Sequence, residues 1–360
     1  MDPQMLMEAP GPIGRPQDLA RRLYPPSYLD RVMDAIKRLP IPYGLLYLLF
    51  FLLESVLVHV VAWLDGWIPP FTFAPINLLY PVWTWGPLAI ITYLDTVAVA
   101  ALSSFRPLLP VQDEAVKRLE YEFTTMPARP VIISGMAWSI AYFIFVYLVL
   151  DDFYEAYAIS PSGAAFTIVT GWIAFFAGSA IYYHSFRQLR LIHRTVQEVK
   201  AFDVFHLDPV YAFSRLTAQT GIAWVFLLSL SLLIFPIQLA ALPFAVTAFF
   251  QVGLAIAAFV LPVWSVHQRL VWEKRGLLAK LNQRVQSTLA RLHGSLDGDE
   301  LGEVPNINSA LAGLAAEREV LTKIPTWPWR VETLTGFLSA LVLPILLFLL
   351  QLAIESWLVK

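Results

Sequence analysis

The sequence predicts an all-α membrane protein, a polytopic bundle of about seven transmembrane helices with the N-terminus inside and the C-terminus outside. Of its 360 residues, 58% are hydrophobic and only 14% are charged, so polar groups could not cover a soluble globule. In addition, 24 of the 25 Lys and Arg residues lie in four polar stretches, 1–40, 106–129, 187–217 and 267–330. Short loops rich in Lys and Arg stay in the cytoplasm, and this asymmetry predicts the orientation.

Seven windows are apolar enough to cross a bilayer, since a transmembrane helix needs about 17–25 mostly apolar residues. They are 41–64, 84–105, 130–150, 164–186, 218–236, 243–266 and 333–355. The first six form one predicted unit, 41–266, with an inner helical extension at 187–217. The seventh helix forms the C-terminal unit, 331–360.

The N-terminal segment 1–40 has no apolar core of the kind found in cleavable signal peptides. Ser27 can cap a helix that begins at Tyr28. Four apolar residues share one face of this helix: Leu29, Val32, Met33 and Ile36. This pattern predicts an amphipathic helix lying on the inner membrane surface.

The outer loop 65–83 is rich in proline and aromatic residues and contains no Lys or Arg. Aromatic residues at this density suit the headgroup layer. The prolines argue against a continuous helix through the loop, which leaves a short re-entrant segment or an interfacial cap as the expectation.

The polar segment 267–330 predicts a cytoplasmic helical hairpin. The sixth helix runs on past Pro262, and an acidic, Gly-rich turn at 294–305 precedes a second helix near 308–322. A heptad repeat marks the first helix at Val271, Leu278, Val285 and Leu292. Such a seam is typical of helix pairing, so these four residues are a candidate contact for another subunit or a partner.

Glu54 and Asp95 fall near the middle of the first and second windows. Carboxylates at the membrane midplane usually face a bundle interior or a wet cavity and serve ions or protons. The alternative is that each is protonated and makes one hydrogen bond between helices.

The outer loops carry acidic but no basic residues before the last residue, Lys360. The acids are Asp65, Asp151, Asp152 and Glu155. An acidic mouth would raise the local concentration of cations. The same excess also arises whenever Lys and Arg are excluded from outer loops.

The seventh window has Thr335 and Ser339 near its inner end and Gln351 at its outer end, with an unbroken apolar run between them. Small polar residues suit close helix packing or a wet pore wall, and an apolar run between polar ends can act as a dewetting gate. Together with Glu54 and Asp95, these three residues form the predicted ion pathway.

Several classes of function are not expected. The absence of cysteine excludes disulfides and thiolate sites, and the basic residues follow topology rather than a nucleic-acid surface. His184 and His267 could meet at the inner interface but do not make a metal site. No P-loop, Gly-x-Ser-x-Gly or His-Glu-x-x-His motif is present, so we expect neither an enzyme nor a metal or other cofactor.

The organisation resembles the insect odorant and gustatory receptor superfamily of seven-helix channels, including gustatory-receptor-like relatives. In that family the last helix often reads Thr-Tyr, five apolar residues, then Gln-Phe. This chain has Pro344-Ile345, five apolar residues, then Gln351-Leu352, so the apolar run and the Gln match while Thr-Tyr and Phe do not. The resemblance implies a tetramer assembled through inner helices near 187–217 and 265–323, with Gln351 in a cation pore.

The leading hypothesis from sequence is a homo-oligomeric (tetrameric) cation channel in the lipid bilayer, gated by an unidentified small-molecule ligand. One alternative is a non-conducting sensor or scaffold acting through the hairpin, and another is a carrier that binds protons at Glu54 or Asp95. The excess of Arg over Lys, 18 to 7, is typical of a GC-rich bacterial genome and predicts a bacterial inner membrane.

Overall fold

The computed structural model describes residues 23–109, 113–157, 160–199, 204–234, 242–298 and 301–358. These residues form helices joined by short connections, with no β-strand among them, which confirms the all-α prediction. The principal helices are α2 (Tyr28–Lys37), α3 (Tyr43–Asp65), α4 (Leu79–Phe105), α5 (Asp113–Thr124), α6 (Ala128–Tyr157), α7 (Pro161–Gly178), α8 (Ala180–Gln197), α9 (Asp208–Ile234), α10 (Leu242–Asp297), α11 (Val304–Lys323) and α12 (Val331–Leu358). Three short 3₁₀ turns precede or follow them: η1 (Pro75–Leu78), η2 (Arg106–Leu108) and η4 (Leu301–Glu303).

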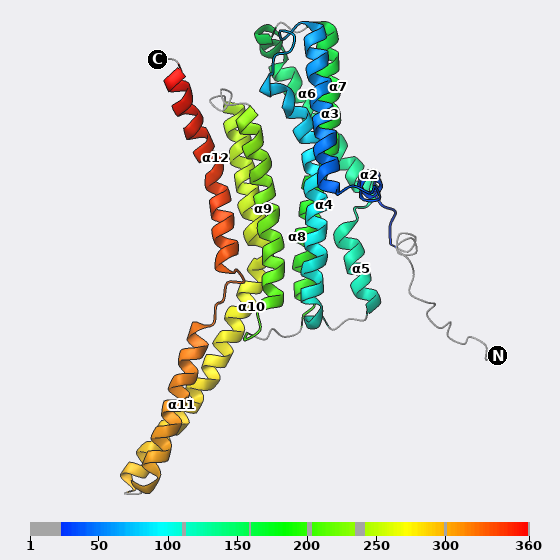
Figure 1. The fold of residues 1–360 in the computed structure, drawn as a ribbon. Coiled ribbons are helices and arrows are strands. Elements are labelled where there is room, and N and C mark those ends of the chain that lie inside the picture. Colours follow the sequence, from blue (N-terminus) through cyan, green and yellow to red (C-terminus); the bar gives the residue numbers. More distant parts are fainter. Residues whose placement is uncertain are drawn as a thin grey trace, which may run out of the picture.

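Within the described ranges, six helical stretches are long and apolar enough to cross a membrane. They are Tyr43–Asp65, Pro75–Leu108, Ala128–Leu148, Pro161–Gln197, Asp208–Ile234 and Phe249–Asp297. Helix α12 adds a further apolar stretch, Val331–Leu347. These elements run up and down beside one another (Figure 1), and the chain is a multi-pass membrane protein. We call the side on which Lys and Arg concentrate the inner side.

The second span begins earlier than the sequence predicts. The proline-rich loop ends at η1, and α4 already includes Pro81 in its first turn and Pro87 in its interior. A proline in the first turn loses no intrahelical hydrogen bond, because the N–H groups there have no partner. The prolines therefore indicated that a loop is present, but they did not indicate the residue at which the loop ends and α4 begins.

The amphipathic helix α2 packs on protein. Ser27 caps it in a capping box with Asp30, which confirms the predicted cap. Leu29, Met33 and Ile36 are buried against side chains of α3, α4 and α8, while Val32 is 41% exposed. The predicted apolar face thus serves mainly to attach α2 to the bundle.

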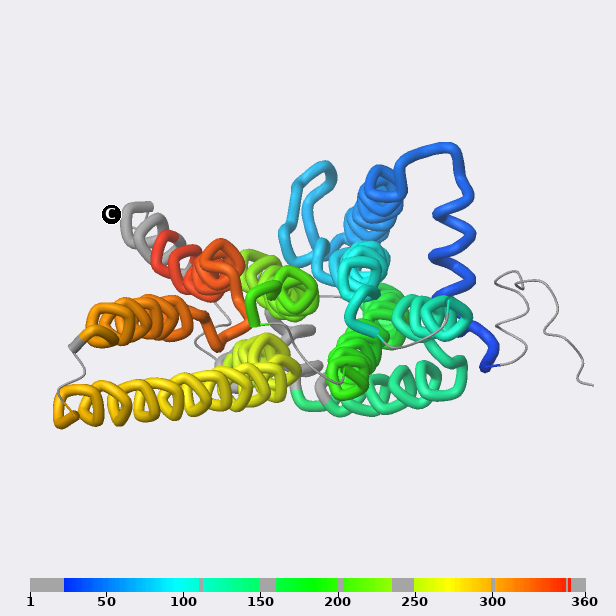
Figure 2. The backbone as a smooth tube through the Cα atoms, turned by 90° about the horizontal axis from the view of Figure 1, so that it is seen from below, coloured from blue at the N-terminus to red at the C-terminus, as the bar shows by residue number. Residues whose placement is uncertain are grey.

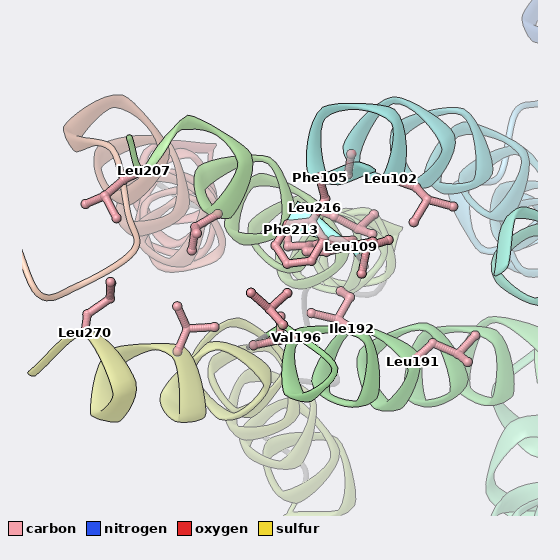
Figure 3. Close-up of a cluster of buried hydrophobic side chains, with 14 of the residues drawn as sticks. Leu102, Phe105, Leu109, Leu191, Ile192, Val196, Leu207, Phe213, Leu216 and Leu270 are labelled. Atoms are coloured by element: carbon pink, nitrogen blue, oxygen red, sulfur yellow. The ribbon is translucent and has the colours of Figure 1, made fainter. Parts of the chain in front are cut away.

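The largest buried apolar cluster gathers at the inner ends of α4, α8, α9 and α10. Figure 3 shows Phe105, Ile192, Val196 and Phe213 packing within it. The rings of Phe105 and Phe213 have centroids 4.5 Å apart. This cluster holds the inner parts of four long helices together.

Helix α10 is continuous over 56 residues and includes Pro262. Its inner half packs against α11 as a hairpin that extends away from the other helices (Figures 1 and 2). Leu281 and Leu321 are buried in this contact. Helix α12 then runs back along the edge of the other helices and packs mainly on α9 (Figure 1).

Candidate functional site: a buried ionic cluster at the inner side

Three ionisable side chains from α2, α4 and α8 meet at Asp95. The Asp95 carboxylate is 3% exposed, and its Oδ1 lies 2.8 Å from Nε2 of His184, which is 1% exposed. Nζ of Lys37 lies 3.7 Å from the other oxygen, Oδ2. A buried carboxylate is stable only when it is paired or hydrogen-bonded, and these two side chains supply the pairing.

The register of α3 against α4 shows the depth of Asp95. Tyr47 and Thr92 share a hydrogen bond of 2.8 Å between their hydroxyls, near the start of α3 and one turn before Asp95 on α4. Lys37, the last residue of α2, lies six positions before Tyr43, the first residue of α3. Asp95 therefore lies level with the inner end of α3, whereas the sequence predicts it near mid-span, because α4 begins before residue 84.

Two polar atoms of the cluster have an incomplete set of partners among the described residues. Asp95 Oδ2 and His184 Nδ1 are buried and make no hydrogen bond, although Oδ2 faces the Lys37 ammonium. Buried polar atoms are nearly always hydrogen-bonded, so these two are available for a proton or a small polar molecule. Lys37, with 35% of its side chain exposed, connects the cluster to water.

A second buried carboxylate, Asp30, fastens α2 to the connection between α5 and α6. Its Oδ2 accepts hydrogen bonds from Ser27 N at 2.9 Å, Ser27 Oγ at 2.7 Å and Met126 N at 3.0 Å. Burial raises the pKa of Asp30 to about 6, although these hydrogen bonds act in the opposite direction. Asp30 thus titrates closer to neutral pH than an exposed aspartate does.

Arg187 continues this network along α8. It donates a hydrogen bond to Tyr24 Oη, and its guanidinium lies 5.2 Å from the centre of the Tyr24 ring. Tyr24 Oη donates to Thr125 O at 3.0 Å, and Tyr121 Oη donates to Tyr24 O at 2.9 Å. The segment before α2 is therefore clamped between α5 and α8.

Glu54 lies apart from the inner cluster. It sits midway along α3, half-buried, and its Oε1 accepts a hydrogen bond of 3.1 Å from Thr84 Oγ1 on α4. Glu54 thus makes a hydrogen bond between two helices, as the second interpretation of the sequence expects. His59, further out, accepts from Ala74 N through Nε2 and uses Nδ1 to bond Ser55 O at 2.8 Å, so the ring is held as the Nδ1–H tautomer.

The predicted acidic mouth is only partly described. Asp65 accepts hydrogen bonds from Ser160 Oγ, from Ser160 N at 3.2 Å and from Ser162 Oγ at 3.1 Å. It therefore caps the N-terminal end of α7, where negative charge is favourable. Asp151, Asp152 and Glu155 belong to the last turns of α6 instead of a loop, and their side chains lie outside the described part of the chain.

The polar residues of α12 do not join Glu54 or Asp95. Thr335 and Ser339 are exposed on the side of α12 that faces away from Phe337, which is 2% exposed and packs on Phe259 of α10. The side chain of Gln351 lies outside the described residues. Glu54, Asp95 and the inner end of α12 thus lie at three separate places in the structure.

The heptad residues Val271, Leu278, Val285 and Leu292 are half-buried in the hairpin, and Leu278 packs in the cluster that includes Leu281, Leu321 and Ile324. Their own chain supplies α11 as the partner of this seam. A second protein would have to contact another face of the hairpin or displace α11.

The pairing of His184 with Asp95 could not be read from the sequence. His184 binds Asp95, whereas His267 lies 3.0 Å from Thr326 O through Nδ1 and stacks on Trp327 with centroids 3.8 Å apart. Nor did the sequence single out Gln251 of α10, whose Nε2 donates to Tyr182 Oη at 3.2 Å. Gln251 and Tyr182 line a small cavity with Trp83 and Trp224.

Among the described residues no group of three or more His, Asp or Glu side chains is placed to hold a metal ion. The Asp95 carboxylate instead has two partners that can balance its charge: the Lys37 ammonium and, when it carries a second proton, the His184 ring. Comparison with protein families, with curated proteins and with solved structures finds no match for this chain.

Proposed function

We propose that this membrane protein is a proton-linked carrier whose proton site is Asp95 with His184 and Lys37. The observation that carries the proposal is the buried pair of Asp95 and His184, with the half-exposed Lys37 ammonium facing the second oxygen of Asp95. Ionisable residues within membrane helices are expensive, and where they are found they usually mark proton or ion pathways.

The charge balance of the cluster gives the mechanism. With His184 neutral, the Asp95 carboxylate is balanced by Lys37 alone. A proton that binds His184 supplies the balancing charge from within the bundle, so Lys37 is free to turn toward water. Proton binding and the position of the inner end of α2 are thereby coupled. The cavity at Gln251 and Tyr182, on α10 and α8, has room for no more than about one water molecule.

Proton flux into liposomes tests this proposal. Purified protein is reconstituted with a pH-sensitive dye inside and a potassium diffusion potential across the bilayer. We expect wild-type protein to conduct protons and Asp95→Asn to reduce the flux to that of protein-free liposomes. Glu54→Gln is the matched control, because a Gln oxygen can keep the hydrogen bond from Thr84. Equal flux in wild type and Asp95→Asn would refute the assignment.

A second candidate is the homo-oligomeric cation channel, and the open face of α12 favours it. Thr335, Gly336 and Ser339 are exposed at the inner end of this face, and Val342 and Leu346 are 47% and 57% exposed further out. A neighbouring subunit or a central pore would cover these residues. The resemblance to the seven-helix receptor superfamily, the tetramer, ligand gating and the bacterial inner membrane all belong to this candidate.

The channel is tested by symmetry and current. A tetramer in native mass spectrometry, with cation currents that Ser339→Leu reduces and Leu57→Ala on the exposed face of α3 leaves unchanged, would favour α12 as the pore wall. A stable monomer in nanodiscs would remove the shared pore. No described contact specifically favours the third hypothesis, a sensor or scaffold acting through the hairpin.

A further inference from the structure

The connection between α3 and η1 exposes an unusual amount of aromatic surface at the outer side. We call residues 66–74 the outer aromatic loop. Phe71 is 90% exposed and Phe73 67% exposed, and Leu64 at the end of α3 is 83% exposed. In the view of Figure 2 the loop, in light blue, projects at the edge of the helices beside α3.

The outer aromatic loop is held in one shape by hydrogen bonds. Trp63 Nε1 donates to Thr72 O at 2.9 Å, and Thr72 N donates to Pro69 O at 3.1 Å, which closes a tight turn. The Phe73 ring stacks on His59 at 5.2 Å with an interplanar angle of 7°, and His59 accepts from Ala74 N. The exposed rings are therefore presented by a fixed backbone.

Phe71 occupies a backbone conformation that favours glycine. Its φ is 60°, at the third position of the turn Pro69–Thr72, where the type II pattern requires a positive φ. A bulky residue in the left-handed region costs about 1–2 kcal/mol. Replacing it by glycine would remove this strain, so a ring exposed to water here would be doubly unfavourable.

The absence of charged residues from the loop indicates whether water, protein or lipid surrounds it. Residues 66–94 contain no charged side chain, so the loop offers no charge complementarity to a soluble partner. It lies at the outer end of two spans, where aromatic side chains settle between headgroups and acyl chains. Exposed apolar rings at this level find a partner in lipid.

We propose that the outer aromatic loop inserts Phe71 and Phe73 into the outer leaflet and so fixes the depth of α3. Leu64 lies ten residues beyond Glu54, a rise of about 15 Å in a helix. That is half the thickness of a hydrocarbon core of about 30 Å. The anchor therefore holds Glu54 at the midplane, whichever transport function the chain has.

The absence of cysteine from the whole sequence makes a depth measurement direct. Single variants Phe71→Cys, Leu57→Cys and Ser309→Cys are labelled with a nitroxide and reconstituted in phosphatidylcholine–phosphatidylglycerol vesicles. Leu57 is exposed within α3 and serves as the hydrocarbon control, while Ser309 is exposed on the hairpin and serves as the water control. Accessibility to oxygen and to a soluble nickel complex then gives the depth of each label.

We expect the label at Phe71 to lie between the two controls, at the level of the headgroup–acyl boundary. A label as accessible to nickel as that at Ser309 would overturn the proposal. Mutual broadening of labels at Phe71 would show a second copy of the chain there and would also overturn it. As a second measurement, Phe71→Ser with Phe73→Ser should shift a label at Leu64→Cys toward water; an unchanged depth would show that the rings do not anchor α3.

Discussion

At the scale of single residues, the two inner carboxylates are buried for different purposes. Asp95 pairs with two basic side chains, Lys37 and His184. The hydrogen-bonded oxygen of Asp30, Oδ2, accepts instead from Ser27 and Met126, and none of these donors carries a positive charge. A buried carboxylate without a cationic partner is stabilised by protonation. The protonation of Asp30 therefore controls how strongly α2 is held to the connection between α5 and α6.

We expect the titration of Asp30 to make the free energy of unfolding depend on pH. Its pKa rises from 3.8 to about 6 on folding, so its contribution is fully present below pH 3.8 and is lost as the pH rises through about 6. The shift corresponds to about 3 kcal/mol. We expect Asp30→Asn to flatten the change in melting temperature between about pH 4.5 and about pH 7.5, measured by differential scanning fluorimetry in detergent.

Asp34→Asn is the control for this measurement, because Asp34 is exposed on the same helix. It should keep the wild-type pH dependence. If Asp30→Asn and Asp34→Asn follow the same curve as the wild-type protein, the titration of Asp30 does not govern the attachment of α2.

At the scale of elements, sequence patterns located the helices well because hydropathy is a property of contiguous residues. The heptad from Val271 to Leu292 predicted that the inner part of α10 would pair with a helix, and α11 is the helix that it meets. The start of α4 was placed too late, since Pro81 can occupy a first helical turn. A pattern that depends only on neighbouring residues gives no information on which tertiary partner will satisfy it.

We expect substitutions at two leucines of α10 to differ in how far they destabilise the hairpin. Leu281 is 1% exposed and Leu289 is 38% exposed. Leu281→Ala should destabilise the hairpin by about 2–4 kcal/mol through lost burial and the cavity left behind, and Leu289→Ala by less than about 0.5 kcal/mol. Hydrogen exchange of α11 amides measures the difference. Similar protection in the two variants would mean that α11 does not depend on this seam.

At the scale of the whole molecule, the sequence indicated which polar residues matter but not which of them meet. Lys37, Asp95 and His184 come from three helices, and His184 is 89 residues from Asp95 along the chain. No local pattern connects residues so far apart. The same holds for the predicted ion pathway, which stays a prediction: Glu54 and Thr335 are both polar residues in apolar windows, yet Glu54 faces α4 and Thr335 faces away from Phe337.

The orientation of the chain stays a prediction of the positive-inside pattern, and the cysteine-free sequence allows it to be measured. Pro161→Cys at the outer end of α7 and Ser309→Cys on α11 are both exposed sites. In intact bacterial cells a membrane-impermeant maleimide should label Pro161→Cys, and should label Ser309→Cys only after the cells are opened. Wild-type protein, which has no thiol, gives the background. Labelling of Ser309→Cys in intact cells would place Lys37 and Asp95 at the outer side, and the proton site would then open to the opposite compartment.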